Sequence, residues 1–183
     1  AMRTKPVFTY LANTLRSGDR QVPYSLVTAT DLSSITNAVN AGAAPAGPPP
    51  IVLNDWTARD LRVKPGDPLT LEYYVWEEPG RLSSRTADFR VAAVVPIAGA
   101  AADRDFAPVY PGLTDADTIG DWDPPFPVNL RRVRPMDEDY WKQYRTTPKA
   151  FIPIEAGQAL WRSRYGDRTS MRVVPMSGQP LGE

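Results

Sequence analysis

The chain has 183 residues, which is enough for one domain or two small ones that fold without disulfide bonds. Its 21 lysines and arginines balance 21 aspartates and glutamates, which argues against a cationic surface for nucleic acid or membrane binding. The absence of histidine and cysteine excludes Ser-His-Asp and Cys-His catalytic sites. No apolar run approaches the roughly 20 residues that span a bilayer, and Ala1 before Met2 indicates a cleaved tag, so we expect a soluble piece of a longer protein.

The first third of the chain is predicted to begin with an antiparallel hairpin. Its strands are residues 7–15 and 22–29, which are rich in strand-forming residues and separated by a Ser-Gly-Asp turn. Pro23 lies inside the second strand and indicates an edge position or a bulge. Residues 38–50 are mostly Ala, Gly and Pro, so we expect a linker that separates two parts of the structure.

The central stretch, residues 51–97, is the most regular part of the sequence. Asn54 is a predicted helix N-cap, because apolar residues recur after it at helical spacing. Residues 69–76 alternate apolar and polar and predict a strand, and residues 89–95 predict a second one. The intervening Lys-Pro-Gly-Asp sequence predicts a type II turn, which requires a positive φ at Gly66.

The last third mixes short helices with short strands. Residues 121–127 hold too much proline for a helix or central strand and predict an ordered loop. Helices are expected at 136–146, where acids favour the positive end of the helix dipole, and at 155–165. Residues 150–154 and 170–174 are the expected strands.

Acidic side chains supply two candidate chemistries. Residues 115–123 partly match a calcium-binding loop, but Ile119 and Phe126 stand where ligand oxygens belong, so a solvated acidic loop is the favoured interpretation. A glycosidase would need two carboxyl groups facing each other across a cleft, and three acids at a helix start are more simply dipole partners. The acids available for such a pair are Asp121, Asp123, Asp137, Glu138 and Asp139.

The aromatic residues supply the candidate binding surface. Most of them are expected in the core, but Trp76 is out of phase with the apolar face of its strand, and Trp122 and Phe126 lie in a loop. We therefore predict a functional surface on the 115–127 loop and the 76–85 hairpin tip, since recognition residues are usually carried by loops. No phosphate-binding glycine motif is present, so no nucleotide is expected to bind.

Two stretches resemble a known family. The run IVLNDWTARDLRVKPGDPLTLEYYVW, followed by FRVAAVVPI, resembles the extracytoplasmic domain of FtsX/MacB-type ABC-transporter permeases. The segment DEDYWKQYRTTPKAFIPIEAGQALWRSRYGDRTSMRV resembles the return strand, helix and closing strand of that family. The match covers residues 50–174, and a long insertion at 113–134 departs from the shorter members.

The resemblance implies an α+β fold, the MacB-like periplasmic core. Residues 1–49 and 98–183 would form an outer, mixed β-α-β subdomain, with 50–97 as an inserted small β-rich subdomain. The domain would face the periplasm or cell exterior, attached to transmembrane helices. It would bind a substrate or partner protein and follow the ATP-driven cycle of a separate cytoplasmic ATPase.

The same resemblance implies no catalytic residues, no cofactor and no metal. An alternative is a secreted carbohydrate- or ligand-binding module that uses Trp76, Trp122 and Phe126. The excised domain is expected to be monomeric, because its charge is balanced and it has no coiled-coil heptads.

Overall fold

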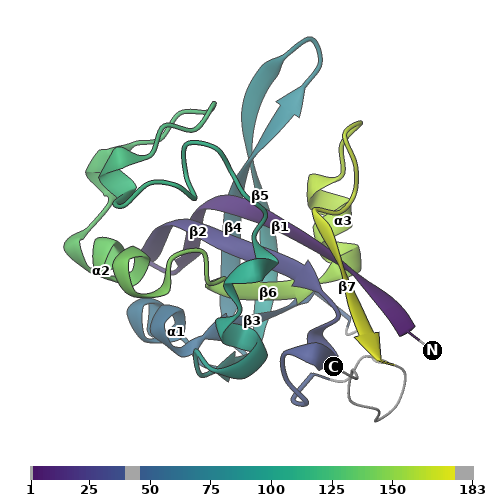
Figure 1. Cartoon of the computed structure of the whole chain (residues 1–183). Coiled ribbons are helices and arrows are strands. Elements are labelled where there is room, and N and C mark those ends of the chain that lie inside the picture. Colours follow the sequence, from purple (N-terminus) through teal and green to yellow (C-terminus); the bar gives the residue numbers. More distant parts are fainter. Residues whose placement is uncertain (1, 40–45, 176–183) are drawn as a thin grey trace.

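The structure, a computed structural model, describes residues 2–39 and 46–175, so part of the expected linker lies outside the described residues (Figure 1). The strands are β1 (Met2–Ser17), β2 (Arg20–Thr30), β3 (Pro50–Asn54), β4 (Pro68–Glu77), β5 (Arg81–Val95), β6 (Ala150–Pro153) and β7 (Ser170–Pro175). The α-helices of this described part are α1 (Asp55–Leu61), α2 (Pro135–Tyr144) and α3 (Ile154–Trp161). Its 3-10 helices are η1 (Leu32–Ser34), η2 (Gly99–Ala102), η3 (Arg104–Phe106), η4 (Ile119–Asp121) and η5 (Leu130–Arg132).

The strands form one sheet that closes on itself. Its order is β2-β6-β3-β5-β4-β1-β7, and β1 also pairs with β2, so the first six strands of this order make a closed barrel. The pairs β2–β6 and β3–β5 are parallel, and the remaining pairs are antiparallel. Strand β1 has 16 residues and serves three neighbours: β7 at residues 2–7, β2 at 8–17 and β4 at 12–16.

The expected α+β fold, with a β-α-β subdomain and an inserted β-rich subdomain, is wrong. The described residues form a mostly β domain, with a six-stranded barrel, one extra strand and three short helices. Strands β3 and β4, which come from the central stretch, hydrogen-bond to β6 and β1 from the flanking parts. The parallel β2–β6 pair joins Val27 to Ala150, far apart in sequence, and periodicity carries no information on such pairings.

The barrel core follows from the alternation of apolar residues along the strands. In β4, Leu69, Leu71 and Tyr73 are buried, whereas the residues between them are partly exposed. Helix α3 packs closely on β2, because a Cβ on Gly157 would stand 2.2 Å from the Ala29 Cβ. The largest fully buried side chains are Phe89, Phe106, Phe151, Leu15, Ile51 and Leu53.

Several local predictions are confirmed. The N-terminal hairpin is present as β1 and β2, and Pro23 lies where β2 pairs with β1 alone. The Asn54 side chain accepts a hydrogen bond from the Thr57 backbone N–H at 2.9 Å and caps α1. Gly66 has a φ of +100°, and the Asp67 N–H donates to the Lys64 carbonyl across the predicted turn.

Candidate functional site

The β4–β5 hairpin extends beyond the barrel as a two-stranded ribbon (Figure 1). Strand β4 pairs with β1 only as far as Tyr73, whereas its pairing with β5 continues to Glu77 opposite Arg81. From residue 74 to 77, the outer edge of β4 therefore has no neighbouring strand among the described residues. The Tyr10 hydroxyl donates to the Tyr74 carbonyl and fixes the base of the hairpin to β1.

A cleft of about 610 Å³ lies between this hairpin and the residues that follow α3. Tyr10 and Trp161 line it, and their rings stack with centroids 5.1 Å apart and planes 10° apart. Trp76 lines the cleft from the hairpin and is 59% exposed, so its predicted exposure is confirmed. The size lies in the range of ligand-binding pockets, although a role for Trp76 in binding stays a prediction.

A smaller, apolar hollow of about 220 Å³ adjoins the cleft and shares Tyr10 and Trp76 with it. The loop between η3 and η5 supplies Phe126, whose ring lies 6.2 Å from that of Tyr74. Phe126 is half-buried, so the structure brings two of the three predicted aromatic residues to one place. Among the lining residues are Tyr10, Tyr74, Trp76, Leu82, Tyr110 and Phe126.

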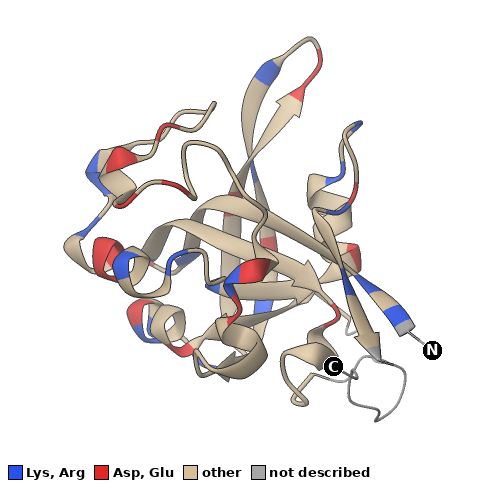
Figure 2. Cartoon of the chain, in the orientation of Figure 1, with Lys and Arg blue, Asp and Glu red and all other residues tan. Residues whose placement is uncertain are grey.

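The β4–β5 hairpin carries charges of both signs (Figure 2). Glu77 accepts hydrogen bonds from Arg81 at 2.8 Å and from Arg85 at 2.9 Å. These hydrogen bonds lower the pKa of Glu77 to about 2. The Glu77 carboxylate is therefore ionised at neutral pH, and two guanidinium groups balance its charge.

The turn after α3 forms the opposite side of the cleft. Ser163 and Gly166 exchange two backbone hydrogen bonds of 3.1 Å, which places Arg164 and Tyr165 at the tip of a tight turn. The Arg164 guanidinium lies 4.9 Å from the centre of the Tyr165 ring and 3.5 Å from the Glu78 carboxylate. Both members of the Arg164–Glu78 pair are well exposed, so it contributes little to stability and can open at small cost.

Sequence reasoning missed four residues of this cleft. Tyr10 lies in an expected strand and Trp161 in an expected helix, and nothing in either pattern marks them as site residues. Arg162 and Arg164 lie in the run WRSRYGD, where arginines and an aromatic residue occupy a turn between a helix and a strand. That run could have indicated a surface site, because large side chains in a short connection have little core to pack against.

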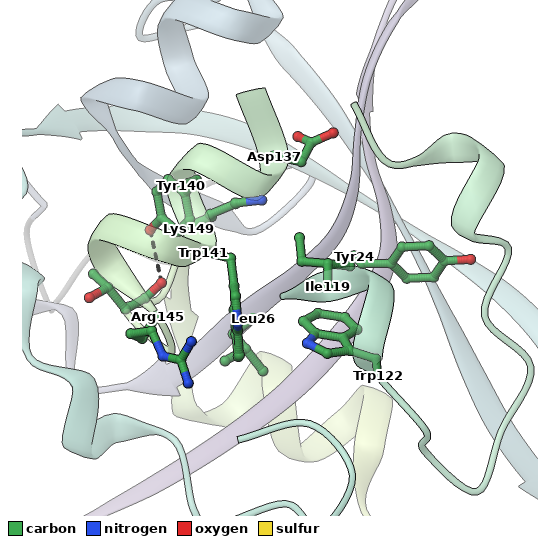
Figure 3. A pocket seen from close by; sticks show the side chains of 10 residues that line it. Tyr24, Leu26, Ile119, Trp122, Asp137, Tyr140, Trp141, Arg145 and Lys149 are labelled. Carbon is green, nitrogen blue, oxygen red and sulfur yellow. Dashed lines mark hydrogen bonds between the residues drawn. The ribbon is translucent and has the colours of Figure 1, made fainter. Parts of the chain in front are cut away.

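Trp122 lies elsewhere, and its predicted exposure is wrong. It is only 8% exposed, and its ring packs 5.0 Å from Trp141 and 6.4 Å from Tyr24. Figure 3 shows these side chains with Ile119 beside a cavity of about 20 Å³, which has room for about one water molecule. Trp122 therefore belongs to a small core beneath the loop and does not line the aromatic cleft.

The loop that carries Trp122 is fixed at two points. The Asp123 N–H donates to the Gly112 carbonyl at 2.8 Å, so the two sides of the loop touch. The Glu138 carboxylate accepts the N–H groups of Ile119 and Gly120 at 2.9 and 3.0 Å and joins the loop to α2. The loop is thus part of the folded body and not a separate recognition surface along its whole length.

The acidic candidates have structural partners. Asp115 accepts the Gly112 N–H at 3.0 Å, and Asp121 accepts the Thr118 hydroxyl at 2.8 Å, so both stabilise turns of the loop. Asp137 is buried and binds Arg134 at 2.8 Å. Within residues 2–39 and 46–175, no three Asp or Glu side chains gather as a metal site.

Lys149 lies beside the small internal cavity (Figure 3). It is 3% exposed, and its ammonium lies 4.9 Å from the centre of the Trp56 ring and 4.7 Å from that of Tyr140. Burial lowers the pKa of Lys149 to about 8, although the negative charge of Asp137 acts in the opposite direction. Cation–π contact with the two rings supplies part of the stabilisation that water no longer provides.

Comparisons with known proteins do not identify a family. No family model matches the chain, and no curated protein sequence matches it. In the part of the chain that the structure describes, no helix has both the length and the apolar character needed to cross a membrane. The function must therefore be argued from the geometry of the cleft and from the ordered motifs.

Proposed function

We propose that the chain is a recognition domain that binds a substrate or partner protein in the aromatic cleft, as the extracytoplasmic domain of an ABC-transporter permease. The observation that carries the recognition role is Trp76, a largely exposed aromatic residue between two preformed hollows. Large aromatic side chains and arginines dominate the binding energy of protein interfaces, and both occur here. Recognition would be the domain's contribution, with ATP hydrolysis left to a cytoplasmic subunit.

The placement in a permease is supported by two observations. One is the resemblance of the ordered motifs, from the Ile51 run to the final strand, to those of FtsX/MacB-type permeases. The other is the pairing of β1 with β7, which sets Met2 opposite Pro175 and brings both ends of the described chain together (Figure 1). A domain inserted between two membrane helices needs such adjacent ends.

The carbohydrate-binding alternative loses its predicted platform. It required Trp76, Trp122 and Phe126 on one exposed surface, and Trp122 is buried around a different cavity. Trp76 and Phe126 instead line an apolar hollow together with Tyr10, Tyr74 and Tyr110.

The test of the placement uses the natural full-length protein in its own cells. Val109 is 83% exposed and lies outside both hollows, so Val109→Cys introduces an accessible thiol into a segment that has no cysteine. A membrane-impermeant maleimide should label this variant in intact cells as fully as in lysed cells, with the unsubstituted protein as the control. Labelling that appears only after lysis would place the domain in the cytoplasm and reject the proposal.

A further inference from the structure

We propose that the occupant of the cleft is an extended segment of a partner protein that pairs with the free edge of β4 and alternates large apolar with acidic residues. This inference deepens the proposed function and rests on it. Three features of the described residues support it: the unpaired edge, the different chemistry of the two hollows, and two cleft arginines, of which one has no ion pair and the other only a weak one.

The unpaired edge of β4 selects for an extended backbone. Beyond Tyr73, β4 has β5 on one side and no described strand on the other; the Tyr74 carbonyl accepts the Tyr10 hydroxyl, and the outward backbone groups beyond it are left for a partner strand. The cleft runs along this edge, because Val75, Trp76 and Glu77 all line it. A peptide that adds a strand here gains main-chain hydrogen bonds, a recognition mode that lipids and sugars cannot use.

The different chemistry of the two hollows favours a ligand segment in which apolar and acidic residues alternate. Side chains of a strand point to opposite faces in turn, so Tyr74 and Trp76 face one side of the hairpin while Val75 and Glu77 face the other. The smaller, apolar hollow lies against the Tyr74 and Trp76 face. A strand added at the β4 edge would turn every second side chain toward this face, and the hollow of about 220 Å³ suits one large apolar side chain among them.

The opposite face selects for acidic side chains. Glu77 is matched by Arg81 and Arg85, so its carboxylate does not repel an incoming acid strongly. Arg162 also lines the cleft and takes part in no ion pair among residues 2–39 and 46–175. Guanidinium groups bind carboxylates in bidentate geometry, which makes Asp and Glu the fitting side chains.

Arg164 strengthens this selection. Its guanidinium donates to the hydroxyl of neighbouring Tyr165 at 2.7 Å, and its ion pair with Glu78 is an exposed contact of 3.5 Å, so an acidic ligand can replace Glu78. Arg81 and Arg85 already bind Glu77 and do not line the cleft, so Arg162 and Arg164 are the cationic groups that it offers to a carboxylate of the ligand.

The test measures binding of three acetylated, amidated, fluorescein-labelled hexapeptides to the 183-residue chain by fluorescence anisotropy. The first alternates, Phe-Glu-Leu-Glu-Phe-Glu; the second has the same residues in blocks, Phe-Leu-Phe-Glu-Glu-Glu; the third alternates lysine, Phe-Lys-Leu-Lys-Phe-Lys. The alternating acidic peptide should bind at least tenfold more tightly than the other two. Equal binding of all three, no binding of the first, or preference for the lysine peptide would overturn the proposal.

Variants of the chain locate the binding site. Trp76→Ala should weaken the acidic peptide at least tenfold, and Arg162→Glu combined with Arg164→Glu should weaken it by a similar factor. Matched controls are Leu130→Ala and Arg131→Glu, which change an exposed apolar residue and an exposed arginine outside both hollows. Equal losses in the controls would show that the effect is not local and would reject the assigned site.

Two further readouts separate this inference from its rivals. Hydrogen exchange should slow when the peptide binds at those backbone amides of residues 74–77 that point away from β5, as strand addition requires. Binding to phosphatidylglycerol vesicles through Trp76, without peptide binding, would assign the cleft to an acidic lipid instead. Peptide binding together with cytoplasmic labelling of Val109→Cys would reject the permease placement alone, whereas external labelling without peptide binding would reject only the peptide.

Discussion

Trp122 and Trp76 lie in two different aromatic clusters. The backbone segments that carry them differ in how they are hydrogen-bonded to the rest of the domain. Trp122 lies on a loop, yet it is buried, because Gly112, Asp123 and Glu138 hold that loop against α2. Trp76 lies on a strand, yet it is exposed, because β4 continues past the end of its pairing with β1. Exposure here follows from which backbone groups are paired nearby and not from whether a residue is in a strand or a loop.

We expect Trp122 to contribute to the stability of the fold and not to binding, and Trp76 to contribute to binding and little to stability. The largest effect is expected for Trp122→Ala, which removes a buried ring packed on Trp141 and Tyr24. Such a truncation should lower the free energy of unfolding by about 3–5 kcal/mol, as measured by urea denaturation. A loss below about 1 kcal/mol would show that the loop is not part of the core.

Lys149→Met should stabilise the protein, and the gain should depend on pH. The pKa of Lys149 is about 8 in the folded chain, below its usual 10.5, so the unfolded state binds more protons between these values. The cost of burying the ammonium is therefore fully present below pH 8 and disappears as pH rises to 10.5. At pH 7 the variant should gain about 1–3 kcal/mol, net of the lost cation–π contact.

The measurement for Lys149→Met is urea denaturation at pH 7 and at pH 10 beside the unsubstituted chain. Lys142→Met, which changes an exposed lysine of α2, is the matched control and should show little change at either pH. A gain that is the same at both pH values would mean that the lysine is not charged at pH 7 or that packing alone explains it.

Gly112→Ala tests the closure of the loop. Gly112 has a φ of +82°, and an added Cβ would stand 2.2 Å from the Asp123 carbonyl oxygen. The substitution should cost about 1–3 kcal/mol, since both the backbone and the contact must shift. Gly18→Ala also places a side chain at positive φ, but nothing lies within 4 Å, so the difference between the two variants isolates the contact.

Trp76→Ala should have the smallest effect on stability, within about 0.5 kcal/mol, because the side chain is largely exposed. The same variant is expected to lose binding, so stability and binding separate at this position. A destabilisation comparable to that of Trp122→Ala would show that Trp76 is buried in solution, with the hairpin folded over the cleft.

Local structure was largely predictable from the sequence, and the overall architecture was not. The sequence pattern located β4 and the second half of β5, which begins at Arg81 and not at residue 89 as predicted. The Asn54 cap and the Gly66 turn depend on side chains and dihedral angles within a few residues. The closed barrel depends on pairings such as β2 with β6, which no local pattern specifies. For the same reason, Trp76 was correctly predicted to be exposed from strand phase, whereas the burial of Trp122 depends on distant Trp141 and Tyr24.

The ribbon of β1 and β7 has a mechanical consequence. Its strands are antiparallel, so residues 2 and 175 lie at the same end, and a force that separates them breaks the backbone pairs one after another instead of all at once. The barrel closes without β7, through β1–β2 and β1–β4, so the ribbon can peel apart while the cleft stays intact. In a protein attached at both ends to moving helices, this ribbon would yield first and limit the load that reaches the binding site.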